Sequence, residues 1–274
     1  MNVGDSGEQR LRHLAISKHD REAAAFEGEY DSRGTAGYRS TAFLLGREKI
    51  DRLLADRLGA LPEGARVLDA GCGTGHQVAD LVEAGFSAVG IEPAAEMRTR
   101  AEALNPGVEV VDGSITDLPF GDASFDAVIA LEVLRYLPRS DNLAAYREMR
   151  RILRPGGLLF ATMVNRWAID GYALWEAVAS RRSRTVDGPT RAHCEFVTPG
   201  GARRDLLAHG FRDVEAHGRL LLPLRWAYKV DLGLGRIAAT VLDPVDDLLA
   251  RVPGTAGLAG HLIVVARAAD EAKG

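Results

Sequence analysis

The chain predicts an α/β fold in which a mostly parallel sheet of seven strands carries helices on both faces. Two observations lead to this prediction. Between residues 66 and 164, short apolar runs alternate with segments of helical periodicity, which is the pattern of strand–helix–strand units with right-handed crossovers. The chain of 274 residues, 46% hydrophobic and 26% charged, is also long enough and apolar enough to bury one large core.

The expected elements begin with a helix at residues 41–58, where Ile50, Leu54 and Leu58 recur on one face. The elements that follow alternate in type. We expect strands at 66–70, 88–91, 108–111, 125–131 and 158–164, and helices at 77–84, 94–104 and 142–153. A helix at 198–209 and strands at 211–216 and 262–266 complete the sheet. Residues 166–195 and 219–258 break the alternation and are expected to be insertions.

Charge and cysteine content restrict the class of protein. The 34 basic and 38 acidic residues give a net charge of −4, which argues against a nucleic-acid partner because such proteins usually carry a basic excess. Two cysteines, Cys72 and Cys194, exclude a disulfide framework and suit a reducing compartment. We find no signal peptide and no apolar stretch of about 18 residues, so we expect a cytoplasmic protein without a membrane partner.

The first motif that points to a function is at residues 67–75, Val-Leu-Asp-Ala-Gly-Cys-Gly-Thr-Gly. Three alternate glycines there join an expected strand to an expected helix. In an open parallel sheet such a loop lies under a bound ligand. The dinucleotide fingerprint G-x-G-x-x-G, counted from Gly71, needs a third glycine at position 76, which is His76. The spacing Asp-x-Gly-x-Gly-x-Gly is instead that of S-adenosylmethionine (SAM) enzymes, and it brings Asp69 near a cationic ligand. The alternative is a glycine-rich turn without a ligand.

A second feature follows about 20 residues later, as in nucleotide-binding sheets. Glu92 ends the second expected strand, in Val-Gly-Ile-Glu-Pro. Its carboxylate accepts two hydrogen bonds, which suits the two hydroxyls of a ribose. The alternative is a solvated glutamate at a strand end, but the spacing favours the ribose.

With these motifs the chain resembles a class I SAM-dependent methyltransferase with a Rossmann-like fold. Its motifs are most similar to those of the small-molecule branch, which includes ubiquinone and menaquinone methyltransferases and natural-product tailoring enzymes. The resemblance covers residues 40–165, and more weakly 193–216 and the last strand. It rests on five segments: VLDAGCGTG (67–75), VGIEPAAEM (89–97), DGSITDLPFGDASFDAV (112–128), LEVLRYL (131–137) and LRPGG (153–157).

The resemblance implies a set of cofactor contacts. These are Tyr30, Asp69, Gly71, Cys72, Gly73, Glu92, Pro93, Met97, Ser114, Ile115, Ala130 and Leu131. Asp69 faces the ammonium group of the cofactor and Glu92 holds the ribose, while Cys72 is a small buried residue and no nucleophile. Many relatives carry aspartate at the position of Ser114, whose hydroxyl makes a weaker hydrogen bond to the adenine amine. No metal site is expected.

The resemblance also implies an organisation in which the ends of the chain cover the cofactor and insertions choose the substrate. Tyr30 and Tyr38 flank residues 31–37, which we expect to be flexible. The segments are an N-terminal helical lid at 1–40, a SAM-binding core at 41–165, a cap insertion at 166–195, a continuation of the core at 196–218, a second insertion at 219–258, and the last core strand and tail at 259–274.

The second insertion has three alternative roles. It roofs an apolar acceptor pocket, contacts a second copy in a homodimer, or rests on a membrane surface. A helix on a membrane surface carries lysine and arginine on its polar face. This segment instead contains four aspartates, which argue against a membrane. They are Asp231, Asp243, Asp246 and Asp247.

A hydroxyl acceptor needs a group that takes its proton. His193 is the first choice because a histidine near this position often borders the acceptor pocket in relatives; the alternative is a structural histidine. Glu132 and Tyr136 lie just past the fourth expected strand and are candidates for orienting an acceptor, although Glu132 is equally well explained as a cap. We interpret His76 and His209 as structural.

We therefore expect a SAM-dependent methyltransferase that acts on a small molecule, at an oxygen atom, in natural-product tailoring or secondary metabolism, and releases S-adenosylhomocysteine. The alternatives are an RNA or protein methyltransferase, disfavoured by the acidic balance, and a nicotinamide oxidoreductase, disfavoured by His76. A third is a non-catalytic SAM-binding partner protein.

Overall fold

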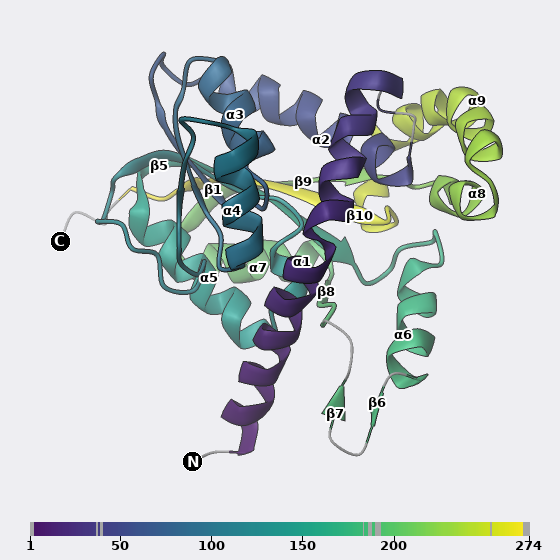
Figure 1. Cartoon of the computed structure of the whole chain (residues 1–274), viewed down its shortest axis with the longest axis horizontal. Coiled ribbons are helices and arrows are strands. Elements are labelled where there is room, and N and C mark those ends of the chain that lie inside the picture. Colours follow the sequence, from purple (N-terminus) through teal and green to yellow (C-terminus); the bar gives the residue numbers. More distant parts are fainter. Residues whose placement is uncertain are drawn as a thin grey trace.

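The computed structural model confirms the predicted fold class (Figure 1). The structure describes the backbone at residues 3–36, 38, 41–182, 184–185, 188–189, 193–252 and 254–270. Within these ranges it describes all side chains except those at 3–6, 24–36, 180, 182, 184–185, 188–189 and 225.

The central sheet has the strand order β3-β2-β1-β4-β5-β10-β9. Its strands are β1 (Arg66–Ala70), β2 (Ser87–Ile91), β3 (Glu109–Val111), β4 (Phe125–Ala130), β5 (Leu153–Asn165), β9 (Phe211–Arg219) and β10 (His261–Ala268). Neighbours from β3 to β5 are parallel, whereas β10 is antiparallel to both β5 and β9. The short β8 (Phe196–Val197), which was not predicted, pairs with the end of β5.

Helices cover both faces of the sheet because successive strand residues point to opposite sides. The helices are α2 (Ala42–Leu58), α3 (His76–Glu83), α4 (Ala95–Leu104), α5 (Arg139–Ile152) and α7 (Pro199–Ala208). In β4, Ala127 and Ile129 pack with residues of α2 and α3, whereas Val128 and Ala130 pack with residues of α5 and α7. The alternation read from the sequence therefore sets the two layers of the core.

The N-terminal helix α1 (Val3–Ala36) crosses the molecule in front of the sheet (Figure 1). Arg12 binds Asp141, near the start of α5, at 2.5 Å, and Asp20 accepts a hydrogen bond from the amide of Glu96, near the start of α4. Both helix starts follow the carboxyl ends of parallel strands, so α1 spans that edge of the sheet. We expected a flexible stretch at 31–37, but residues 31–36 belong to α1. Extending an established helix adds one hydrogen bond per residue, which favours its continuation to Ala36.

The two insertions lie together on the right of Figure 1. The first contains α6 (Tyr172–Arg182) and the strand pair β6 (Arg184–Thr185) and β7 (Gly188–Pro189). The second contains α8 (Leu224–Val230), α9 (Leu232–Ala250) and the short η2 (Thr255–Gly257). They meet where the rings of Trp175 and Trp226 lie 6.4 Å apart. None of the helices that the structure describes combines the length and the apolar composition needed to cross a membrane.

A buried lysine joins the second insertion to the core. The Nζ atom of Lys49, on α2, lies 3.1 Å from Asp243, 2.6 Å from Asp246 and 2.8 Å from Asp247, all on α9. Asp246 is fully buried and also accepts a hydrogen bond from the amide of Leu222 at 2.6 Å. Since a buried carboxylate is costly without a compensating cation, this cluster fixes how α9 packs on α2.

Removing the cation of this cluster should destabilise the fold. We expect Lys49→Met to lower the free energy of unfolding by about 3–5 kcal/mol, because it leaves buried carboxylates uncompensated. Arg52→Met is the matched control: Arg52 is exposed on the same helix and should change stability by about 0.5 kcal/mol or less. Urea unfolding measures both, and an equal effect of the two substitutions would contradict the expectation.

Candidate active site

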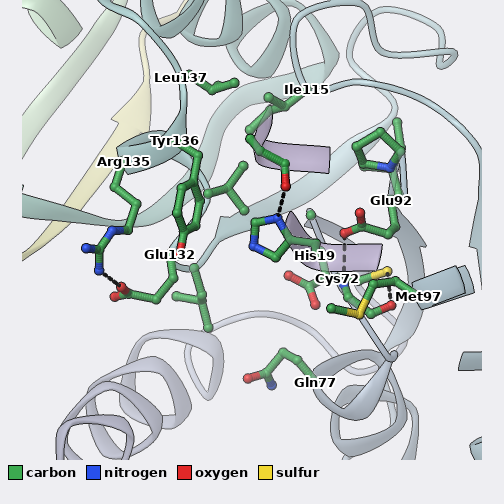
Figure 2. A pocket seen from close by; sticks show the side chains of 18 of the residues that line it. His19, Cys72, Gln77, Glu92, Met97, Ile115, Glu132, Arg135, Tyr136 and Leu137 are labelled. Carbon is green, nitrogen blue, oxygen red and sulfur yellow. Dashed lines mark hydrogen bonds and ion pairs between the residues drawn. The ribbon is translucent and has the colours of Figure 1, made fainter. Parts of the chain in front are cut away.

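A cavity of about 490 Å³ lies at the carboxyl ends of β1, β2 and β4, beneath α1 (Figure 2). Most of the predicted cofactor residues line it. These are Asp69, Gly71, Cys72, Gly73, Glu92, Pro93, Met97, Ser114, Ile115 and Leu131. Ala130 is not in the lining, since its side chain belongs to the core on the α5 side of the sheet. The side chain of Tyr30 lies outside the described residues.

The glycine loop has the backbone that its sequence requires. Gly71, Gly73 and Gly75 have φ angles of +79°, +56° and +78°, a region that side-chain-bearing residues rarely adopt. A Cβ atom at Gly71 would also lie 2.3 Å from the Cγ2 atom of Val133, so the loop packs tightly against the segment after β4. The loop therefore brings bare backbone to the cavity wall.

Two carboxylates are buried beside this loop. Glu92 accepts hydrogen bonds from the amides of Gly73, at 3.1 Å, and Ala94, at 2.9 Å. Asp69 is 3% exposed at the end of β1, and burial raises its pKa to about 7; the charge of Arg47 opposes this shift and that of Glu92 adds to it. Burial likewise raises the pKa of Glu92. Two buried acids at one end of a cavity fit a ligand with cationic and hydroxyl groups.

The Cys72 thiol is not a nucleophile in this arrangement. Burial raises the pKa of Cys72, and the nearby charges of Asp69 and Glu92 raise it further. The thiol therefore stays protonated at neutral pH and serves as packing, since a Cβ at Gly90 would lie 2.5 Å from its Sγ atom.

The four residues that the resemblance assigns to the adenine, Pro93, Met97, Ser114 and Ile115, all line the cavity. The Ser114 hydroxyl accepts a hydrogen bond from the amide of Thr116 at 3.2 Å and lies 2.8 Å from the Thr116 hydroxyl. Part of its hydrogen-bonding capacity is thus used within its own turn.

Glu132 lies at the other end of the cavity, in a strained backbone conformation with φ of +60°. Its Oε1 atom lies 2.6 Å from Arg219, 3.3 Å from the Nδ1 atom of His261 and 3.1 Å from the Thr162 hydroxyl, and its Oε2 atom lies 3.1 Å from Arg135. Burial by itself favours the neutral acid, but His261 and Arg219 hold the pKa of Glu132 well below its usual range. Glu132 is therefore a fixed anion and a poor proton acceptor.

The other two predicted catalytic residues, His193 and Tyr136, lie in different places. His193 does not belong to the described lining of the cavity, and its Nε2 atom pairs with Glu195 at 2.9 Å. Tyr136 does line the cavity, and Lys18 donates a hydrogen bond to its hydroxyl at 3.3 Å. The structure therefore brings Glu132 and Tyr136 together and leaves His193 apart.

His19 of α1 was missed from the sequence and lies between Tyr136 and Glu92 (Figure 2). Its ring packs edge-on against Tyr136 with centroids 4.8 Å apart, and its Nδ1 atom donates to the Ala15 carbonyl at 2.8 Å. Burial lowers the pKa of His19 below its ordinary value of 6.5. The available signal was helical spacing, since the lining residues of α1 among its described side chains are Arg12, Ala15, Ile16 and His19.

Comparisons with known proteins agree with this geometry. Residues 68–161 match the family described as a methyltransferase domain. The chain is 36% identical to a ubiquinone biosynthesis O-methyltransferase of Methylocella silvestris over 187 residues, which is 66% of this chain and 72% of that protein. It is 38% identical to a demethylmenaquinone methyltransferase of Beutenbergia cavernae over 162 residues, 59% of this chain and 64% of that protein.

A solved structure has the same fold. It is a SAM-dependent methyltransferase of Thermotoga maritima, described as a possible histamine N-methyltransferase, with 19% identity, a TM-score of 0.58 and coverage of 93% of this chain and 98% of that chain. Fold, glycine loop and buried carboxylates together define a SAM-binding enzyme fold. The chain belongs to the class I SAM-dependent methyltransferases, and SAM is its cofactor.

The raised pKa of Asp69 predicts a pH-dependent cofactor affinity. If its carboxylate pairs with the ligand's ammonium group, the proton bound below pH about 7 must leave on binding. We expect the affinity for S-adenosylhomocysteine, measured by calorimetry, to fall about tenfold from about pH 8 to about pH 6.

Asp69→Asn is the matched control for this titration because it keeps the volume and removes the charge. It should bind more weakly and lose most of the pH dependence, whereas Glu92 still titrates in it. An affinity of the wild type that stays constant across this range would contradict the assignment of Asp69.

Proposed function

We propose that the chain transfers the methyl group of SAM to a hydroxyl oxygen of a small, largely apolar molecule. The observation that supports this most is the roof over the cavity: α1 crosses it and is held at two positions along its length, by Arg12 on Asp141 and by Asp20 on the amide of Glu96. A roofed cavity admits a small acceptor more readily than a folded RNA or protein. The similarity to a ubiquinone biosynthesis O-methyltransferase also favours an oxygen acceptor.

The two ends of the cavity suit two different ligands. The end with Asp69 and Glu92 suits the cofactor, as described above. Away from these two acids, the lining also includes the apolar side chains of Phe43 and Leu137 and polar groups in fixed positions, among them Arg219. Ligand pockets that orient an apolar molecule through a few polar groups have this composition.

When bound, SAM supplies a methyl group on a positively charged sulfur, which is already activated for displacement. The chain then has to align the acceptor oxygen and take up its proton. His19 has the right properties for the second task. Because Nδ1 donates to the Ala15 carbonyl, the neutral ring carries its lone pair on Nε2, and burial keeps the ring neutral at pH 7. The hydroxyl proton passes to His19 while the oxygen gains the methyl group.

Glu132 acts through Arg219 in this proposal. It fixes the guanidinium of Arg219 at the cavity wall, with the two groups 2.6 Å apart. A guanidinium held in this way orients an oxygen-bearing acceptor by hydrogen bonding. Glu132 and Arg219 are therefore positioning residues for the acceptor, and Tyr136 forms the wall beside His19.

The function is tested by methyl transfer from labelled SAM into an extract of the source organism, with Glu92→Ala as the blank. Products are separated into organic-soluble, RNase-sensitive and protease-sensitive fractions. We expect label in the organic fraction, which also yields the acceptor for identification. Label in a macromolecule would overturn the proposal. No label, with S-adenosylhomocysteine still bound, would support a non-catalytic SAM-binding protein instead.

Substituting His19 tests the proton acceptor. With the acceptor identified, we expect His19→Gln to lower kcat about 10²–10⁴-fold, because general-base catalysis contributes about that much. The wild-type rate should fall at acidic pH, below the ordinary histidine value of 6.5, as His19 becomes protonated. The variant should lose this acid limb while its affinity for S-adenosylhomocysteine changes little.

His193→Gln is the matched control for the same measurement, since His193 lies outside the described cavity lining. It should retain the rate and the pH profile of the wild type. A control that loses the acid limb while His19→Gln keeps it would restore His193 as the base.

A further inference from the structure

The outward surface of the second insertion is apolar along its whole length. We name this surface the outer face and define it by seven residues, each at least 45% exposed. They are Val230, Leu234, Ile237, Val241, Val245, Leu248 and Val252. Their spacing of three or four residues places them on one side of α9 and its flanks. A continuous exposed apolar stripe of this kind marks an interaction surface.

The charges of α9 lie on the opposite side. Asp243 and Asp246 are buried, and together with Asp247 they surround the Nζ atom of Lys49 at 2.6 to 3.1 Å. Three of the four aspartates from which we argued against a membrane surface therefore point toward Lys49 and away from this face. Of the described acidic side chains from residue 224 to residue 250, Asp231 alone is exposed, and it caps the start of α9 by accepting from the amide of Leu234.

The side chains that border the outer face are basic and aromatic. Lys229 and Arg251 are exposed next to Val230 and Val252, at the two ends of the stripe. The Nζ atom of Lys229 also lies 4.2 Å from the ring centre of Trp175, which is 39% exposed and extends the apolar surface onto α6. Apolar residues bordered by lysine, arginine and tryptophan are the composition of helices that lie in a membrane interface.

We propose that the outer face docks on the surface of a bilayer that contains anionic phospholipids. Val, Leu and Ile enter the boundary between headgroups and acyl chains, and Lys229 and Arg251 meet the phosphates. The stripe from Leu234 to Leu248 is about 21 Å long at 1.5 Å per residue, so α9 lies flat on the surface. This inference is independent of the proposed function.

Charge favours the bilayer over a second copy of the chain. Two copies meeting through the outer face would bring the cations of each near those of the other. Asp243, Asp246 and Asp247 are held inward by Lys49 and do not neutralise these cations, which leaves Asp231 as the exposed acid among the described side chains of this segment. An anionic lipid surface supplies the missing opposite charge.

The test is flotation of the full chain with vesicles of phosphatidylcholine and phosphatidylglycerol, and with vesicles of phosphatidylcholine alone. We expect binding to the anionic vesicles that weakens with salt. The pair Ile237→Gln and Leu248→Gln should lower the partition coefficient about tenfold or more, because two large apolar side chains no longer enter the lipid. The pair Lys229→Gln and Arg251→Gln should lower it about tenfold on anionic vesicles only.

The matched control is the pair Val82→Gln and Leu207→Gln, on α3 and α7, which are exposed to similar extents away from the outer face. It should bind vesicles like the wild type, and all variants should keep their affinity for S-adenosylhomocysteine. Wild-type protein that does not float, or an Ile237→Gln and Leu248→Gln pair that floats unchanged, would overturn the proposal. So would sedimentation of the wild type as a dimer that this pair dissociates, which would assign the outer face to a second copy.

Discussion

The structure depends on two carboxylates buried at the carboxyl ends of β1 and β2. Burying a charge is costly, and the fold compensates the two acids differently. Glu92 receives two backbone amides from the glycine loop and from the start of α4, whereas the pKa of Asp69 rises to about 7. The glycine loop, with its positive φ angles, is the backbone that makes this possible. A cationic ligand that pairs with Asp69 removes the cost of its charge, so the binding end of the cavity is stabilised by the cofactor it is built to receive.

At the opposite end of the cavity, the carboxylate charge is compensated by groups of the chain itself. Glu132 is surrounded by Arg219, Arg135 and His261, so its negative charge is permanently satisfied within the chain. Its positive φ angle directs it into this group at a cost of about 1–3 kcal/mol. At one end of the cavity, the charge of Asp69 is compensated when a cationic ligand binds. At the other end, the charge of Glu132 is already compensated by its neighbours in the chain. Only the first can respond to a cation, which supports the proposal that the cofactor binds there and the acceptor at the other end.

The parts of the site predicted from sequence are those that one strand–loop–helix unit determines. The glycine loop, Asp69 and Glu92 follow from local spacing, because the strand end, the turn and the helix start lie within about 20 residues of each other. His19 and Arg219 come from opposite ends of the chain and reach the cavity through tertiary packing, which carries no local pattern. The aspartates of α9 show the same limit: their number was readable, but the side they face depends on Lys49, almost 200 residues earlier.

Helix α2 connects these regions because each of its faces has a different partner. Phe43, Arg47 and Ile50 line the cavity at helical spacing, and Lys49 anchors α9 one residue away from that row. The side chain of Arg47 is only 7% exposed, and its charge opposes the rise in the pKa of Asp69. Helix α2 therefore carries both the arginine that opposes the rise in the pKa of Asp69 and the lysine that binds the aspartates of α9.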